Sequence, residues 1–292
     1  MLGIMFRERY LSLSLPMDGL VRVRRKFYHS KRERPIFLFT HHKAGSKLIR
    51  KIFHHTISRQ KSWAYTRREG FVRTLPFDFD IYQFGHGLVS DEVLKNEFVG
   101  VRIIRDPRDI IVSGYLYHKR TTESWANTRT SIDYHKDLTY PNVPKPLIHE
   151  SIEDKMDYIK RNNNLTYKEN LCSLDQNSGL IFEMDGYSKI TINSMLKFPD
   201  IPNIITIKLE DFESDFQNTL TKILNHVGEL SDTDIHAIGK LCEKFDIKNI
   251  DLDKDPHIST GRVKKWEDYF EEEVARGYQE RFGDAHKILG YS

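Results

Sequence analysis

Cysteine is nearly absent from this chain of 292 residues, in which only Cys172 and Cys242 occur. Two cysteines so far apart in the sequence form neither a disulfide framework nor a Cys-x-x-Cys metal site. Their scarcity excludes a disulfide-stabilised secreted domain and is typical of a protein from a reducing compartment.

Long hydrophobic runs are also lacking. The longest apolar stretches have the length of buried strands, well short of the roughly 18–20 residues that a membrane-spanning helix needs. Near the start, Arg7, Glu8 and Arg9 interrupt what would be the apolar core of a signal peptide, and no small-residue cleavage site follows. We therefore expect no membrane span and a cytoplasmic protein.

A strong excess of one charge is missing too. Lysine and arginine number 45 against 42 aspartates and glutamates, which leaves a net charge of +3. So small a net charge does not favour a nucleic acid or a membrane surface as a partner. Any anion site must be local, and we expect no nucleic-acid partner.

The composition nevertheless favours a folded domain, since 39% of the residues are hydrophobic and the chain is long enough to bury a sizeable core. We expect a single domain over residues 35–292. The basic segment before it, residues 1–34, contains alternating apolar residues around a Pro-Met-Asp-Gly turn, which is the pattern of a hairpin.

Strand and helix patterns alternate along the chain. Buried strands are predicted at 35–40, 81–84, 98–104 and 204–209, and helices at 48–58, 107–118, 151–161, 186–197, 214–227 and 232–245. This alternation predicts a three-layer α/β fold with a central, mainly parallel sheet flanked by helices. Ligands bind such sheets at the carboxyl ends of the strands. The polar, proline-containing residues 121–146 are predicted to form a long surface loop.

The loop between the first strand and helix has the chemistry of a phosphate site. It reads His-His-Lys-Ala-Gly-Ser-Lys over residues 41–47. The free backbone N–H groups of a helix start attract anions, Gly45 lets the backbone approach closely, and the lysines and the serine add donors. The order of residues fails the Walker A pattern, because Thr40 replaces its first glycine and Ser46-Lys47-Leu48 follows Gly45. A capped helix with surface lysines would read the same way, so this loop leaves both interpretations open.

The segment from Val101 to Tyr115 carries a stronger signal. It places Arg105 at a strand end and Ser113 about two helical turns further on, where both side chains can face one anion. Pro107 at the first helical position and Asp106 before it favour the helix start. Taken alone, Arg105 could instead form a salt bridge with a neighbouring aspartate.

Together these segments resemble the sulfotransferases that use 3′-phosphoadenosine 5′-phosphosulfate. Residues 42–46 are similar to the family's 5′-phosphosulfate loop, and residues 105–115 to its 3′-phosphate segment. Residues 207–212 resemble its strand ending in Tyr-Glu-Asp-Leu, and residues 259–266 its closing element, Arg-Lys-Gly-x-x-Gly-x-Trp. The resemblance implies a P-loop-NTPase-like sulfotransferase fold and transfer of a sulfuryl group to an acceptor hydroxyl or amine, giving adenosine 3′,5′-bisphosphate.

The resemblance also assigns binding roles. The expected cofactor-binding residues are Lys43, Ala44, Gly45, Ser46, Lys47, Arg105, Ser113, Ser259, Thr260, Gly261, Arg262 and Trp266. Departures from the family pattern fall mainly in the first loop, where His42 replaces a proline, Ala44 a serine, Lys47 a threonine and Leu48 a tryptophan. Lys264 replaces the second glycine of the closing element.

Two residues are predicted to be catalytic. Sulfuryl transfer, like phosphoryl transfer, needs aligned reactants, neutralised charge and a base for the nucleophile's proton. Lys43 is expected to meet charge on the bridging oxygen. His86 is expected to be the base, because imidazole is available near neutral pH and the Gly85-His86-Gly87 setting ends a strand at the crevice. The family also places a catalytic histidine after this strand.

Other residues receive weaker assignments. The pairs His41-His42 and His54-His55 lack partners at metal-ligand spacing, so no metal is predicted. Trp266 has the closing motif's support as a ring that stacks on adenine or acceptor, whereas Trp63 is expected in the core. Tyr115 and Tyr117 are expected in the core or the acceptor pocket.

The acceptor is not specified by the sequence, and a small molecule, a glycan or a lipid all remain open. Two other functions also remain open at this stage: a P-loop-like kinase, and a non-catalytic protein that binds a nucleotide or a sulfated glycan on the same fold.

Overall fold

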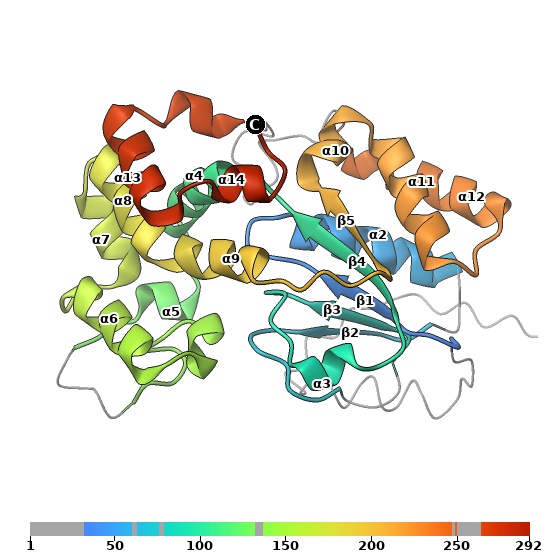
Figure 1. The fold of residues 1–292 in the computed structure, drawn as a ribbon, viewed down its shortest axis with the longest axis horizontal. Helices are drawn as coiled ribbons and strands as arrows, with labels where there is room; N and C mark the ends of the chain where they lie inside the picture. Colours follow the sequence, from blue (N-terminus) through green and yellow to red (C-terminus); the bar gives the residue numbers. More distant parts are fainter. Residues whose placement is uncertain (1–31, 60–62, 76–78, 132–136, 247–248, 250–263) are drawn as a thin grey trace, which may run out of the picture.

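A computed structural model describes residues 32–59, 63–75, 79–131, 137–246, 249 and 264–292, and its fold is drawn in Figure 1. Its strands are β1 (Ile36–Phe39), β2 (Tyr65–Arg68), β3 (Ile81–Phe84), β4 (Val99–Ile104) and β5 (Ile204–Lys208). They form one sheet in the order β2-β3-β1-β4-β5. Every neighbouring pair is parallel. The predicted α/β class is confirmed, and the carboxyl ends of all these strands meet at one edge.

Alternation along β1 sends side chains to the two faces of the sheet, as the period of a strand requires. Ile36 and Leu38 pack in a core with residues of α2 (Ser46–Arg59), α11 (Phe216–Val227) and α12 (Asp232–Cys242). Phe37 and Phe39 pack in an aromatic core on the opposite face. There the ring centroids of Phe37 and Phe98 lie 4.2 Å apart in a stacked arrangement. Because both faces are covered, β1 is buried along its whole length.

Most of the remaining helices form a layer at one end of the sheet, to the left in Figure 1. The helices of the described chain beyond those already named are α3 (Asp91–Leu94), α4 (Pro107–His118), α5 (Ser124–Asn127), η2 (Lys145–His149), α6 (Ile152–Asn162), α7 (Tyr167–Ser173), α8 (Gln176–Asp185), α9 (Tyr187–Leu196), α10 (Leu209–Ser214), η3 (Glu243–Phe245), η5 (Lys265–Asp268), α13 (Glu272–Phe282) and α14 (Ala285–Ile288).

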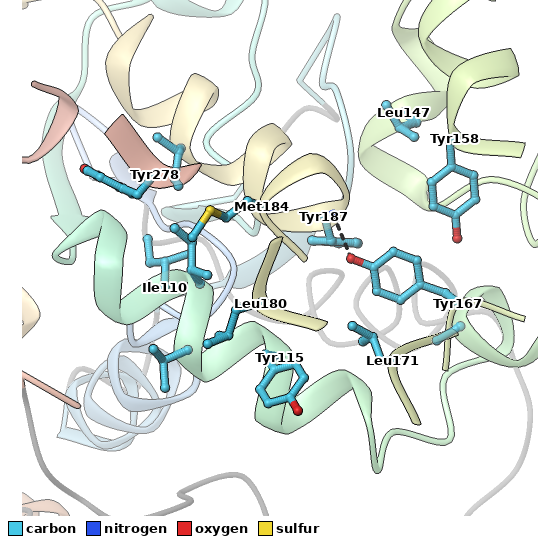
Figure 2. Packing of buried hydrophobic residues seen from close by; sticks show 14 of the residues in the cluster. Ile110, Tyr115, Leu147, Tyr158, Tyr167, Leu171, Leu180, Met184, Tyr187 and Tyr278 are labelled. Carbon is cyan, nitrogen blue, oxygen red and sulfur yellow. Dashed lines mark hydrogen bonds between the residues drawn. The ribbon is translucent and has the colours of Figure 1, made fainter. Parts of the chain in front are cut away.

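Helix α4 connects the sheet to this helical layer. It begins directly after β4, with the Asp106 side chain accepting the N–H of Arg108 and Pro107 in the first turn. Its apolar residues pack with α7, α8 and α9 in a third core, drawn in Figure 2. In that core the hydroxyl of Tyr167 accepts the backbone N–H of Tyr187 at 3.1 Å. The helical layer is thereby held against the edge of the sheet where the strands end.

The structure agrees with the predicted strands and with the predicted helices to within a few residues, but it adds elements. Strand β2 and helices α7, α8, α13 and α14 were not predicted. The segment expected to be a surface loop, residues 121–146, contains α5, where Trp125 is buried. Trp63 is buried in the core, as expected. The predicted hairpin lies almost entirely within residues 1–31, outside the described residues.

Candidate active site

The loop after β1 turns sharply before α2 starts. Lys43 and Gly45 both have left-handed backbone conformations, with φ of 60° and 85°. Three hydrogen bonds hold the turn: Arg105 donates to the Lys43 carbonyl at 3.2 Å, Ser46 donates to the His41 carbonyl at 3.0 Å, and Gln83 donates to the Ser46 carbonyl at 2.9 Å. The loop is therefore fixed from β3 and β4, the strands on either side of β1.

The amine of Lys43 lies in positive surroundings. Its Nζ is 4.1 Å from the centroid of the Tyr117 ring on α4. Burial, and then the positive charges of Arg105, Lys265, Arg120 and Lys47, lower the pKa of Lys43 to about 7. Cations gather here from the first loop, the end of β4, η5 and the end of α4. An arrangement of this kind favours an anion, which would relieve the repulsion between them.

Arg105 follows β4 and Ser113 lies in α4, and both side chains are buried. Arg105 also makes the contact that the sequence left open, since its Nη2 is 3.4 Å from Oδ2 of Asp109. The Asp109 carboxylate in turn accepts the backbone N–H groups of Lys264 at 2.8 Å and Trp266 at 3.1 Å. Asp109, one of the aspartates that the sequence offered as a salt-bridge partner, thus connects Arg105 to the segment containing η5.

Trp266 has one ring face covered. The guanidinium carbon of Arg108 lies 3.8 Å from the centroid of its ring, and Phe270 packs edge-on at 6.0 Å. The expectation that Trp266 stacks on adenine is untested by these contacts, but it applies only to the opposite ring face. Four other expected binding residues, Ser259, Thr260, Gly261 and Arg262, lie outside the described residues.

His86 follows β3 at the same edge of the sheet. Its Nε2 lies 3.0 Å from Oε2 of Glu69, which follows the neighbouring strand β2. Burial is the largest influence on Glu69 and raises the pKa of its carboxyl. The hydrogen bond and charge of His86, with the charges of Arg67 and Lys145, outweigh burial and hold that pKa below its ordinary value. Glu69 is therefore an ionised partner for His86, and it fixes which ring nitrogen faces away from the carboxylate.

His41 has a structural position beside this pair. Its ring packs against Gly87, where a Cβ would lie 2.5 Å from Cε1 of His41, and Gly87 has a φ of 64°. Its Nδ1 is 2.9 Å from the Ser194 hydroxyl on α9. Burial, followed by the charge of Arg102, keeps the pKa of His41 well below its ordinary value. His41 is thus a neutral ring that joins the loop to the helical layer.

Among the described residues, no group of three or more histidine, cysteine, aspartate or glutamate side chains could hold a metal ion. Among the helices that the structure describes, none has the length and hydropathy to cross a membrane.

Sequence reasoning missed Glu69 as part of the site. It considered Asp109 only as a salt-bridge partner of Arg105, and Tyr117 only as a residue of the core or the acceptor pocket. The signal for Asp109 was its closeness in sequence to Arg105, which lies just before α4. Glu69 gave no such signal, because strand β2 reads Tyr-Thr-Arg-Arg and lacks an apolar pattern.

The chain belongs to the sulfotransferase domain family, whose model matches residues 85–290. The match includes His86, Arg105, Ser113 and Trp266, and it begins after the first loop. The predicted resemblance is thereby confirmed, and the protein is a sulfotransferase.

Two solved structures are similar to this chain. One is described as mouse sulfotransferase SULT7A1 complexed with PAP; it is 18% identical, with 93% of this chain and 92% of that chain covered and a TM-score of 0.48. The other is retinol dehydratase in complex with androsterone and inactive cofactor PAP, with 15% identity, coverages of 88% and 82% and a TM-score of 0.40. No curated protein matches the chain.

The environment of Lys43 gives a direct prediction. In the ligand-free protein its amine should titrate near pH 7, because burial and cationic neighbours oppose its protonation. Lysine side-chain NMR of protein labelled at Cε measures this, with the resonance assigned by its loss in Lys43→Arg. Lys95, which is exposed and paired with Glu92, is the internal control. Titration of Lys43 near pH 10 would contradict the described electrostatics.

Proposed function

We propose that this sulfotransferase takes its sulfuryl group from 3′-phosphoadenosine 5′-phosphosulfate and transfers it to an acceptor hydroxyl or amine, releasing adenosine 3′,5′-bisphosphate. The observation that carries this proposal is the convergence of Lys43, Arg105 and Lys265 at the carboxyl edge of the sheet, where their charges are buried together. A donor with phosphates at two positions supplies the negative charge that such a cluster favours.

The proposed binding roles follow the two ends of the donor. The loop from Lys43 to Lys47 binds the 5′-phosphosulfate at the start of α2, and Arg105 with Ser113 binds the 3′-phosphate at the start of α4. The closing segment, with Trp266, covers the nucleotide. Asp109 supports this arrangement, since it holds both Arg105 and the backbone of the closing segment in place.

His86 is proposed to be the general base. Its Nε2–H donates to the Glu69 carboxylate, which leaves Nδ1 unprotonated and able to accept the acceptor's proton. As that proton leaves, the acceptor oxygen or nitrogen forms its bond to sulfur while the bond from sulfur to the bridging oxygen breaks. The electron pair of the broken bond stays on the phosphate, where the Lys43 ammonium neutralises it. The bound anion raises the Lys43 pKa above its ligand-free value of about 7, so the amine is charged when it is needed.

A cavity next to this machinery is the proposed acceptor pocket. It has a volume of about 340 Å³ and is lined by Gly87, the neighbour of His86, and by aromatic side chains that include Phe71, Tyr158 and Phe198. A volume of this order suits a small molecule, or one terminal group of a glycan or lipid. The free thiols of Cys172 and Cys242 support the proposed cytoplasmic location.

Membership of the sulfotransferase family leaves the kinase without support. A non-catalytic binding protein on the same fold would keep the nucleotide site, so the two predictions below separate binding from turnover.

The first of these predictions concerns the 3′-phosphate. Arg105→Ala should weaken adenosine 3′,5′-bisphosphate by about 10- to 150-fold, since a charge-assisted contact to phosphate contributes about 1.5–3 kcal/mol. Adenosine 5′-phosphosulfate lacks the 3′-phosphate and should lose less, although loss of the contact from Arg105 to the Lys43 carbonyl affects both ligands. Titration calorimetry measures both affinities. Equal weakening of the two ligands would assign Arg105 a purely structural role.

The second prediction concerns the base. His86→Ala should lower kcat by about 10²- to 10⁴-fold while the bisphosphate affinity stays near wild type. Glu69→Gln should lower kcat by about 10-fold, because a neutral amide stabilises the imidazolium less than a carboxylate does. Steady-state transfer of labelled sulfate measures both rates, and the exposed Glu92→Gln is the control. Unchanged kcat in His86→Ala with a neutral alcohol as acceptor would remove His86 from the mechanism.

A further inference from the structure

A second histidine of the active-site loop begins a hydrogen-bonded chain that runs into the protein interior. His42, at the position where the family's loop usually has proline, has its Nε2 3.1 Å from Nε2 of His118, the last residue of α4. The two rings are nearly parallel, with an interplanar angle of 8°. Nδ1 of His118 is 2.8 Å from Oε2 of Glu183 on α8. A hydrogen-bonded chain of Glu183, His118 and His42 therefore ends beside Lys43.

Glu183 is the acceptor at the inner end of this chain. It is fully buried and receives hydrogen bonds from the Tyr167 hydroxyl at 2.8 Å, the Ser188 hydroxyl at 2.7 Å and the ring of His118. The Tyr167 oxygen already accepts the N–H of Tyr187, so its own proton is directed to Glu183 (Figure 2). Hydrogen bonds from three donors stabilise the carboxylate form of a carboxyl group, and a positive partner stabilises a buried carboxylate.

A His118 ring protonated on both nitrogens would be such a partner, and its charge would determine the state of His42. With both ring nitrogens protonated, His118 donates Nδ1–H to Glu183 and Nε2–H to His42. Nε2 of His42 must then be an unprotonated acceptor, because only one proton fits between two facing nitrogens. Burial, followed by the charges of His118, Lys43, His86 and Arg67, holds the pKa of His42 well below its ordinary value, so the ring stays neutral. In that arrangement, its proton lies on Nδ1.

We propose that the Glu183–His118–His42 chain fixes His42 as a neutral N–H donor whose Nδ1 hydrogen-bonds an oxygen of the transferred sulfuryl group. This inference rests on the proposed function. His42 is a catalytic residue in this proposal, while His118 and Glu183 are positioning residues that act through it. A neutral donor adds stabilisation to the negative sulfuryl oxygens without adding a further positive charge next to Lys43.

The location of the hydrogen-bonded Glu183–His118–His42 chain, and the ionisable residues that form it, support this role over a purely structural one. Besides His118, the charges that act on the His42 ring are those of Lys43, His86 and Arg67, which belong to the proposed site. Ion pairs in a protein interior add little net stability compared with apolar packing. A contact between α4 and α8 needs no ions, since Ile110, Tyr115, Leu180 and Met184 already pack together there.

The decisive variant is Glu183→Gln. Glutamine keeps the shape of the side chain and can still accept the Nδ1–H of His118, but it removes the charge that keeps His118 protonated on both nitrogens. His118 then accepts at Nε2, and the His42 proton moves from Nδ1 to Nε2. In the wild-type protein, two-bond ¹⁵N–¹H correlation spectra should show His42 protonated at Nδ1, and in Glu183→Gln at Nε2. The kcat should fall by about 10- to 100-fold in Glu183→Gln and by about 10²-fold in His42→Ala.

Thr219→Ala is the stability control, because it removes a buried hydroxyl whose hydrogen bond to the Asp211 carbonyl lies outside the site. It should lower the unfolding temperature and leave kcat and the His42 spectrum unchanged. Loss of thermal stability in Glu183→Gln and His42→Ala, with kcat at the wild-type value, would overturn the proposal. So would a wild-type His42 protonated at Nε2. A separate measurement is whether adenosine 3′,5′-bisphosphate stabilises the wild-type protein against heat. If it does not, the result counts against the proposed function and not against the state of His42.

Discussion

The burial of the Lys43 amine among other cations is the constraint on which the rest of the site depends. An amine held in such surroundings has a pKa of about 7, so the folded chain carries an electrostatic cost that an anion removes. The cost is imposed by the fold. Parallel pairing of β1 with β3 and β4 brings the loop after β1, His86 and Arg105 to one edge of the sheet.

Rigid contacts keep these groups in place without a ligand. Arg105 holds the Lys43 carbonyl and Asp109, and Asp109 holds the backbone that leads into η5. On the opposite side of the loop, Glu69 orients His86. Preorganised groups of this kind need little reorganisation when charge moves during transfer, which is where enzymes gain most of their rate. Our proposals for the donor site, the base and His42 assign each of these groups a place in one reaction.

The sequence predicted the parts of this arrangement whose local pattern is strong. Apolar runs predicted β1, β3, β4 and β5, and the run from Arg105 to Ser113 predicted the start of α4. Strand β2 was not predicted, because its four residues, Tyr65–Arg68, are polar and only half-buried. Glu69 was missed with it, since its role arises from the pairing of β2 with β3. The hydrogen-bonded chain of Glu183, His118 and His42 was not predicted either, because its members lie far apart in sequence and meet only when α8 packs on α4.

The most direct test of the central claim is the number of protons that the protein takes up when it binds adenosine 3′,5′-bisphosphate. Calorimetric titration at pH 8 in two buffers of different ionisation enthalpy measures this number. At pH 8 the free Lys43 amine is mostly neutral, and the bound anion raises its pKa, so binding should take up close to one proton and should weaken as pH rises above 7. Uptake should disappear in Lys43→Arg, whose guanidinium is always charged. Binding of the bisphosphate by the wild-type protein without proton uptake would contradict the account.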